Sequence, residues 1–255
     1  MAQETTAGPR ARYREQVRAE VKERAWVQIA EAGASALSLK AIAKQLGITA
    51  PALYRYFASR DDLLTELILS AYRDLAEVTE TAAAANAGPA PARLTAIAQA
   101  IRAWALANSH RYLLIYGTPV PGYAAPPEAT ELARRILAPI LDGFSAVVSP
   151  DGAGPDSANP GGANPGGVGS DGVGSVGVGS VGVGSAGVGW GEPDPVLRRS
   201  LIFWTRLHGV VSLEVAGHFT GMPFDPALLY AEEVASTLAG FTRPGSRPAE
   251  SGTAG

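Results

Sequence analysis

Residues 38–57 constrain the fold of this chain most, because they contain two short helical patterns separated by a glycine. Ser38 and Thr49 are residue types that cap helix N-termini, and Pro51 falls in a first helical turn, where its missing N–H costs little. Gly47 ends the first pattern. The apolar residues of both patterns recur at helical spacing: Ile42, Leu46, Leu53 and Phe57. The segment therefore predicts a short helix, a glycine turn and a second short helix.

Longer helical patterns flank this segment on both sides. Residues 10–33 carry an apolar stripe with a spacing of four residues, and Gly33 is the predicted C-cap. The stripe consists of Tyr13, Val17, Val21, Ala25 and Ile29. A fourth helix is expected from Arg60 or Asp61, and its wide stripe would connect this head to the rest of the chain. That stripe consists of Leu63, Leu64, Leu67, Ile68, Ala71, Tyr72 and Leu75.

The remainder of the chain is also predicted to be helical. Helices are expected at residues 92–107, 109–116, 127–148, 194–219 and 226–241, and no alternating strand pattern competes with them. The predicted fold class is therefore all-α, with an N-terminal three-helix helix-turn-helix head and a helical C-terminal domain.

Gly and Pro, which number 30 and 19, concentrate in one tract at residues 150–191 that repeats Val-Gly-Val-Gly-Ser. Its large apolar groups are too few to offset the entropy of ordering, so a disordered insert is expected. Residues 167–172 match the nucleotide-binding pattern G-x-G-x-x-G, but neither the required strand nor the required helix flanks them. The predicted divisions are a head at 1–75, a C-terminal domain in two parts at 76–149 and 193–243, the insert at 150–192 and a disordered tail at 244–255.

Charge is distributed unevenly, although the net charge is only -3. Residues 10–60 contain ten Lys and Arg against four Asp and Glu, and the residues from 76 onward contain ten against fifteen. A basic N-terminal part on an acidic body suits a nucleic-acid partner at one end only. The chain has no Cys, no apolar run of membrane-spanning length and no secretory signal pattern at its start, so the cytoplasm is the expected compartment.

Residues 39–63, which read LKAIAKQLGITAPALYRYFASRDDL, closely resemble the DNA-binding head of TetR/AcrR-family repressors. The resemblance extends over about fifty residues and is specific. Two positions depart from the family pattern. Arg60 stands where Lys is usual, and Tyr56 stands where His is common. Either difference affects which operator is preferred, while the charge at Arg60 is kept.

This resemblance implies a set of DNA-binding residues. Phosphate contacts are implied for Lys40, Thr49, Tyr54 and Arg60, and Ser38 joins them as a candidate. The residues implied to face the major groove are Ala50, Pro51, Ala52, Arg55 and Tyr56. Arg55 is the one side chain of this helix able to make a bidentate contact with guanine. The alternative for Tyr54 and Tyr56 is half-buried packing, and for the whole segment it is a three-helix corner of an unrelated helical protein.

The C-terminal part resembles the WHG-type domain of one branch of these regulators. Residues 203–219 contain the Trp, His and Gly of that name as Trp204, His208 and Gly209, and residues 112–123 are similar to the same branch. Trp204 and His208 share a helix face that points into the body. The expected role of His208 is structural, bonded to a carbonyl or to Glu214, and the alternative role is a ligand contact. The candidate pocket residues are Trp104, Tyr112, Tyr116, Trp204 and His208.

The predicted function is a ligand-responsive transcriptional repressor that binds a palindromic operator as a homodimer and is released when a small molecule enters the C-terminal pocket. No cofactor, no metal and no catalytic residue are expected. An enzyme or metal protein using His110, His208, His218 and Glu214 is the alternative, but no metal-ligand spacing and no G-x-S-x-G elbow supports it. A helical adaptor that binds only protein stays open, although it leaves the basic head unexplained.

Overall fold

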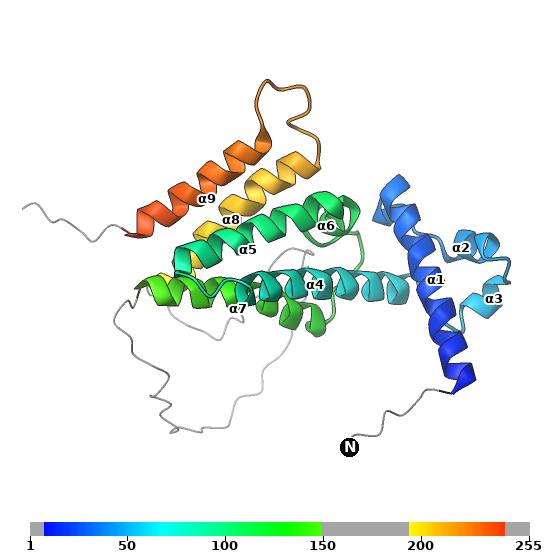
Figure 1. Cartoon of the computed structure of the whole chain (residues 1–255). Helices are drawn as coiled ribbons and strands as arrows, with labels where there is room; N and C mark the ends of the chain where they lie inside the picture. The colour runs from blue at the N-terminus through cyan, green and yellow to red at the C-terminus, as the bar shows by residue number, and fades with distance from the viewer. Residues whose placement is uncertain (1–7, 149–193, 243–255) are drawn as a thin grey trace, which may run out of the picture.

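The computed structural model describes residues 8–148 and 194–242, and within these ranges the chain forms helices and contains no strand (Figure 1). The all-α prediction is therefore confirmed. The predicted insert at 150–192 and the predicted tail at 244–255 lie outside the described residues.

The head consists of α1 (Pro9–Ala32), the 3₁₀ turn η1 (Ala34–Ala36), α2 (Leu39–Gln45) and α3 (Ala50–Leu53). The predicted caps are present: Ser38 Oγ accepts from Ala41 N, and Thr49 Oγ1 accepts from Ala52 N, both at 3.3 Å. Gly47 takes a φ of 66° at the turn between α2 and α3, in the left-handed region that glycine adopts without a Cβ penalty. The short helices therefore begin and end where their local chemistry predicts.

The first turns of α1 differ from the predicted stripe. Val21 and Ile29 are buried in the core of the head, whereas Tyr13 is 65% exposed. The described residues 8–16 are all exposed, so no partner element covers this end of the helix. The stripe predicts the periodicity correctly but overstates how much of α1 is buried.

Helix α4 (Arg60–Ala84) starts at the predicted residue and runs from the head along the body (Figure 1). Ser59 Oγ accepts from Asp62 N at 3.0 Å, and Asp62 Oδ2 accepts from Ala58 N at 3.0 Å, so two N-terminal amides are satisfied. The predicted stripe residues of α4 are buried. This helix therefore links the head to the body through a continuous apolar core.

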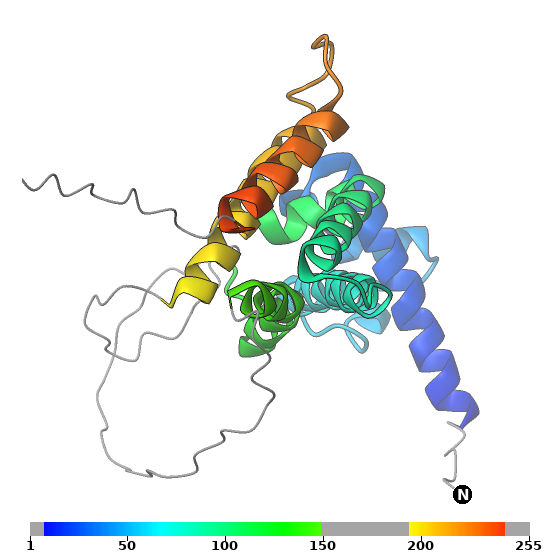
Figure 2. The same ribbon diagram turned by 60° about the vertical axis from the view of Figure 1, so that its left-hand side comes forward.

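The body contains α5 (Ala90–Ala107), α6 (Ser109–Tyr116), α7 (Pro127–Val148), α8 (Pro195–Val215) and α9 (Pro226–Thr242). Helices α4, α5 and α7 pack on one another, and the α8–α9 hairpin packs against α5 and α7. Figure 2 shows this hairpin on one side of the body, with its connecting segment projecting outward. None of the helices within the described ranges is both long and apolar enough to cross a bilayer.

Helix α8 ends earlier than the predicted 194–219. Gly217 takes a φ of 78°, and His218 N donates to Leu213 O at 2.9 Å, which closes the helix as a Schellman-type cap. The predicted final turn is therefore part of the α8–α9 connection.

Candidate functional site

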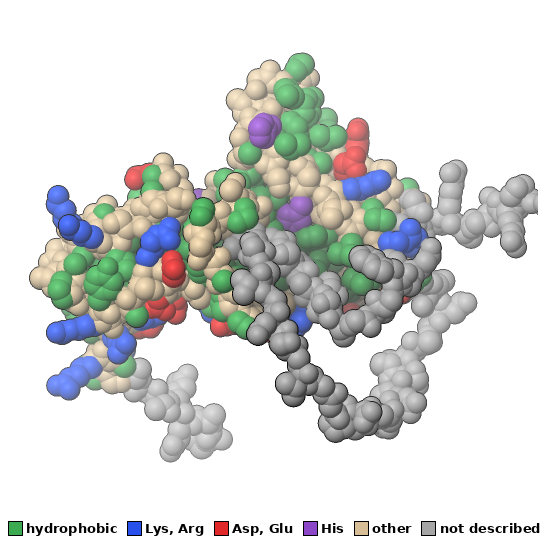
Figure 3. All heavy atoms as spheres, turned by 180° about the vertical axis from the view of Figure 1, so that it is seen from behind, with side chains coloured by type: hydrophobic (Ala, Val, Ile, Leu, Met, Phe, Trp, Pro, Cys, Tyr) green, Lys and Arg blue, Asp and Glu red, His purple; other side chains and the backbone are tan. Residues whose placement is uncertain are grey.

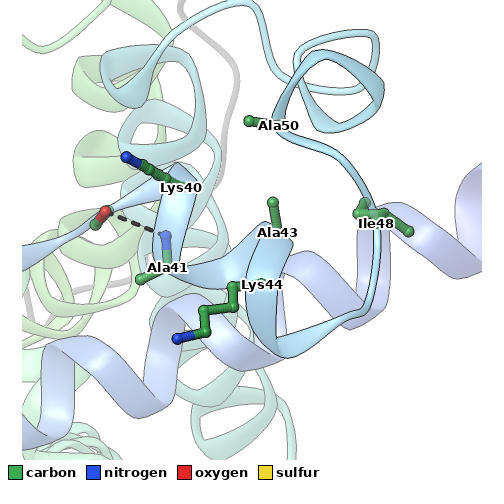
Figure 4. Close-up of a pocket in the computed structure, with 7 residues that line it drawn as sticks. Lys40, Ala41, Ala43, Lys44, Ile48 and Ala50 are labelled. Carbon is green, nitrogen blue, oxygen red and sulfur yellow. Dashed lines mark hydrogen bonds between the residues drawn. The ribbon is translucent and has the colours of Figure 1, made fainter.

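An open groove of about 600 Å³ lies between α2 and α3 in the head (Figure 4). Its lining residues are Ser38, Lys40, Ala41, Ala43, Lys44, Ile48 and Ala50. Lys40 and Lys44 are exposed and lie one helical turn apart on α2, so both charges flank the groove. Figure 3 shows Lys and Arg side chains projecting from the head. The groove carries positive charge, and most of its other lining side chains are small. Such a surface can come close to the negatively charged phosphate backbone of DNA.

Lys44 was not among the DNA-binding candidates predicted from the sequence. The spacing could have indicated it, because Lys44 follows Lys40 by four residues and therefore lies on the same face of the helix as Lys40. Lys44 therefore joins the predicted set as a candidate phosphate contact.

The implied DNA-contacting residues in α3 and next to it fall into two groups. Thr49, Pro51, Tyr54 and Arg55 are exposed, whereas Ala50, Ala52 and Tyr56 are half-buried. Tyr56 packs against the core of the head, so the packing alternative holds for its ring, while Tyr54 is 50% exposed. The DNA contacts of these residues stay predictions.

Helix α3 is shorter than the pattern predicts. It ends at Leu53, and the next residues form turns in which Arg55 N donates to Ala52 O at 3.3 Å and Tyr56 N donates to Leu53 O at 2.8 Å. These bonds span three residues, so the backbone tightens after one α-helical turn. Arg55 consequently lies just beyond the helix, on the exposed side of the tightened turn.

Arg60 makes contacts within the chain that the resemblance does not imply. Its Nη2 donates to Ala34 O at 2.8 Å, its Nε donates to Leu37 O at 3.2 Å, and its Nη1 lies 3.3 Å from Asp61 Oδ1. The planar guanidinium thus ties the start of α4 to the segment that leads into α2. The phosphate contact stays a prediction, and Arg60 has in addition a positioning role in the head.

Arg18 is a second residue that holds the predicted DNA-facing surface in place, and it was not among the candidates predicted from the sequence. From α1, its Nη1 donates to Tyr56 O at 2.5 Å, its Nη2 lies 2.7 Å from Glu66 Oε1, and its guanidinium carbon lies 4.4 Å from the centroid of the Phe57 ring. These contacts fix the turn after α3 against both α1 and α4. No helical periodicity reports a contact across 38 residues, so the pattern alone could not reveal it.

In the body, four of the five candidate pocket residues form one aromatic cluster. The ring centroids of Trp204 and His208 are 4.0 Å apart, those of Tyr116 and His208 are 4.4 Å apart, and those of Tyr112 and Tyr116 are 5.3 Å apart. Tyr72 of α4, which the sequence assigned only to an apolar stripe, adds an edge contact with Tyr116 at 6.2 Å. The cluster joins α4, α6 and α8.

Trp104 lies apart from this aromatic cluster. It lines a separate open pocket of about 410 Å³, whose other lining residues are Asp74, Glu77, Val78, Thr81 and Asn108. The expectation that it shares one cavity with the other four residues receives no support from this arrangement.

His208 has a polar environment that differs from the expected one. Its Nδ1 is 2.8 Å from Tyr112 Oη, which is also 2.9 Å from Ser212 Oγ. The expected partner Glu214 instead accepts from Arg102 Nε at 2.8 Å and from Arg102 Nη2 at 2.5 Å. Neither a carbonyl nor Glu214 is therefore the hydrogen-bond partner of the imidazole in this structure.

Burial decides the charge state of the cluster. It lowers the pKa of His208 to about 3, and it raises the pKa of Tyr112 to about 12. The imidazole is therefore neutral at pH 7. Its Nε2 is buried without a hydrogen-bond partner among the described residues, so a donor or acceptor is left unsatisfied.

The metal and enzyme alternatives gain no support from the described part of the chain. No group of three or more His, Asp or Glu side chains there is arranged to hold a metal ion. His110 makes an edge contact with Trp26 at 5.5 Å, and Glu214 is engaged by Arg102. These side chains have structural partners instead of a shared centre.

A helix-turn-helix head with a cationic groove, joined by one long helix to a helical body, defines a DNA-binding regulator. Residues 23–67 match the family described as bacterial regulatory proteins, tetR family. Residues 94–237 match the family described as tetracyclin repressor-like, C-terminal domain. The chain belongs to the TetR family, whose members are transcriptional regulators and not enzymes.

Individual proteins of known sequence or structure agree with this assignment. The chain is 34% identical over 235 residues to the HTH-type transcriptional regulator Rv1816 of Mycobacterium tuberculosis, covering 90% of this chain and 94% of that protein. It is 44% identical to SCO4313, whose crystal structure matches with a TM-score of 0.68 over 91% of this chain and 100% of that one. FadR from Bacillus subtilis, crystallised with stearoyl-CoA, is 13% identical and has a TM-score of 0.58, covering 87% of this chain and 98% of that one. The likeness to FadR shows the fold alone.

Proposed function

We propose that this regulator is a ligand-responsive repressor, which binds a palindromic operator as a homodimer and leaves it when a small molecule reaches the aromatic cluster of the body. The observation that carries the ligand response is the buried Nε2 of His208, which has no hydrogen-bond partner within residues 8–148 and 194–242. An unsatisfied buried polar atom costs about 1–3 kcal/mol, and a ligand that hydrogen-bonds to it would recover that cost. The proposal includes the cytoplasm as the compartment, because a bacterial chromosome lies there.

Helix α6 supplies a route by which such a ligand would affect the head. One side of α6 carries Tyr112 and Tyr116 into the aromatic cluster. The other side carries Arg111, whose guanidinium carbon lies 4.7 Å from the centroid of the Trp26 ring on α1. A ligand that displaces the two tyrosines would move α6 against α1 and so shift the head relative to the body. If the ligand binds one position of the head more tightly than the other, it changes the affinity of the protein for DNA. FadR, which has this fold and was crystallised with stearoyl-CoA, supports the idea of a small-molecule effector.

The proposed dimer uses α8 and α9 of each subunit in a four-helix bundle. Leu213 is 45% exposed and Leu228 is 64% exposed on these helices, and Gly209 has open space where a Cβ would stand. Gly209 and Leu213 lie one helical turn apart on the same face of α8, so a small residue that allows close approach stands next to an exposed leucine, which supports a partner on this face.

The oligomeric state tests this part directly. Sedimentation at micromolar concentration should show a dimer for the wild type and a monomer for Leu228→Glu, because the new carboxylate would be buried against the partner. Leu106→Glu, at a leucine on α5 that is 40% exposed, is the matched control and should stay dimeric. A monomeric wild type, with or without DNA, would refute the dimer.

Selection of bound DNA from a random pool tests the regulator as a whole. Two recognition surfaces related by two-fold symmetry should enrich an inverted repeat, whose half-sites lie about one helical turn or a multiple of it apart. Enrichment of a single asymmetric site, or of none, would contradict a dimeric operator-binding protein.

Arg55 and Arg60 should then contribute in different ways. Arg55→Ala should relax base preference, because a bidentate base contact supplies about 1–3 kcal/mol of discrimination. Arg60→Ala should weaken binding to all sequences and make the salt slope shallower by about one unit if Arg60 contacts a phosphate. Arg60→Lys separates the two roles of that residue: it keeps a phosphate contact but loses the fork to Ala34 and Leu37. A change of base preference by Arg60→Ala alone would contradict the assignment of Arg55 as the base-reading residue.

A further inference from the structure

A cavity of about 520 Å³ lies where the head meets the body, away from the aromatic cluster. Its lining residues are spaced along two stretches of the chain: from Ile29 to Ser35 at the end of α1 and in η1, and from Ser109 to Pro121 in α6 and the loop that follows. Glu31, Arg111, Tyr112 and Tyr116 fall within these stretches but do not line the cavity. Figure 1 shows the end of α1 beside α6 at this junction. The volume lies within the range of small-molecule sites in proteins, about 300–1,000 Å³.

The loop that forms one wall is held in place by specific contacts. A Cβ at Gly117 would lie 2.3 Å from Leu113 O, so only glycine permits this close turn after α6. Val120 is buried, and Tyr123 Oη is 2.9 Å from Thr65 Oγ1 of α4. The Gly-Thr-Pro-Val-Pro segment therefore presents a preformed wall, which lowers the entropic cost of binding.

The described lining residues include no Asp, Glu, Lys or Arg side chain. The adjacent Arg111 packs on the Trp26 ring and pairs with Asp74, so its guanidinium is engaged outside the cavity, although its charge still acts on His110. Burial and then the neighbouring Arg111 lower the pKa of His110, the one titratable side chain of the lining, so its imidazole is neutral at pH 7. A charged ligand would lose part of its hydration here without gaining an ionic partner among the lining residues.

The shape of the lining side chains narrows the ligand further. The rings of Pro119 and Pro121 and the neutral imidazole of His110 belong to the lining, and Leu113 is 41% exposed in the wall. Ser35 and Ser109 add a hydroxyl from the head and another from the body. Flat faces with a few polar groups suit an aromatic ring system that carries a hydroxyl or a similar neutral group.

We propose that this junction cavity is a second ligand site, which binds an uncharged aromatic molecule and thereby changes the affinity of the head for DNA. Because the ligand contacts α1 and α6 at once, it distinguishes between two positions of the head relative to the body. Such differential contact is the requirement for coupling two sites. Ligand binding at the junction does not depend on the proposed effector at His208, whereas the effect on DNA depends on the DNA-binding role of the chain.

The first test uses 2-naphthol, which is uncharged at neutral pH, and the carboxylate 2-naphthoate as its charged counterpart. We expect calorimetric titration to show that 2-naphthol binds the full chain and that 2-naphthoate binds about tenfold more weakly or not at all. Leu113→Glu should weaken 2-naphthol about tenfold by placing a charge in the wall, whereas Leu106→Glu, equally exposed on α5, should leave it unchanged. Absence of 2-naphthol binding, or equal binding by Leu113→Glu, would overturn the site.

The same variants separate the site from its effect on DNA. Saturating 2-naphthol should change the Kd for selected operator DNA by about fivefold or more in the wild type, and not in Leu113→Glu. Binding without any change in Kd would overturn the coupling. A chain that bound no DNA even without 2-naphthol would instead refute the proposed function, and the calorimetric result would still decide the site. A change of oligomeric state in Leu113→Glu would identify this wall as a protein interface and overturn the proposal.

The absence of Cys from the chain allows a second measurement that does not depend on Leu113. Ser109→Cys would carry a unique thiol at the cavity, and N-phenylmaleimide would attach an uncharged ring to it. The labelled protein should no longer bind 2-naphthol, whereas the labelled control Ser145→Cys, at an exposed position on α7, should bind it normally. Unchanged 2-naphthol binding after labelling of Ser109→Cys would place the ligand elsewhere and refute the site.

Discussion

Replacement of His208 by Gln should remove a pH dependence from the stability of this protein. The folded chain holds the imidazole buried, with a pKa lowered from about 6.5 to about 3, whereas the unfolded chain exposes it to water. As the pH falls below about 6.5, the unfolded state binds a proton that the folded state does not bind. The free energy of unfolding therefore decreases with falling pH until the folded pKa is reached.

The size of this effect follows from the two pKa values. Each pH unit below the unfolded pKa costs about 1.4 kcal/mol, so the contribution of His208 between pH 7 and pH 5 is about 2 kcal/mol. Urea denaturation followed by circular dichroism, at one fixed protein concentration, measures it. The wild type should lose about 2 kcal/mol more than His208→Gln over this interval. Other titrating groups are common to both proteins and cancel in the difference.

Tyr112→Phe is the control for the hydrogen bond to the imidazole. It removes the hydroxyl that lies 2.8 Å from His208 Nδ1, but it keeps the imidazole buried. Its overall stability should be lower, while its loss between pH 7 and pH 5 should equal or exceed that of the wild type. If the wild type and His208→Gln lost the same free energy over this interval, the argument that burial holds His208 neutral would be refuted.

Three other perturbations test separate parts of the structure. Gly117→Ala should destabilise the fold by about 1–3 kcal/mol in denaturation experiments, whereas Gly88→Ala, which meets nothing within 4 Å, should not. Arg18→Gln should weaken operator binding without changing how steeply the affinity falls with salt concentration, because Arg18 holds the turn after α3 and is not expected to contact a phosphate. An altered salt dependence would indicate a direct phosphate contact by Arg18. Deletion of residues 151–189 should leave folding, dimerisation and DNA binding intact, because the entropy lost on closing a long Gly-rich connection is only slightly larger than for a short one. Loss of the soluble dimer would show instead that the tract drives association.

The helices and their ends were predictable from the sequence because they depend on neighbouring residues. Apolar spacing predicted the helices of both head and body, and α6 and α7 have the predicted bounds. Ser38, Thr49 and Gly47 mark the ends of α2 and α3 through hydrogen bonds and backbone angles that involve only the next few residues. The same reasoning failed at Val215, where the Schellman-type cap ended α8 before the apolar pattern did.

For the candidate DNA-binding surface, the sequence also predicted which side chains are exposed and which are buried, because this depends on their positions around a short helix. Exposure of Arg55 and burial of Leu53 and Phe57 follow from their positions around a short helical segment. The contacts that hold this surface were not predictable, because Arg18 reaches Tyr56 across 38 residues and Arg60 reaches back to Ala34 across 26. Periodicity indicates which face of a helix is buried, but not which distant backbone oxygen a long side chain will reach.

The body shows the same division between local pattern and tertiary packing. The sequence by itself determined that Trp204 and His208 share an inward face of one helix, since four residues make about one turn. Only the tertiary structure placed Tyr112 beside His208 across 96 residues, separated Trp104 from the cluster and left the cavity between α1 and α6. The physical reason is that a helix forms through hydrogen bonds between residues four apart, whereas the partners and cavities of its side chains depend on how several complete helices pack.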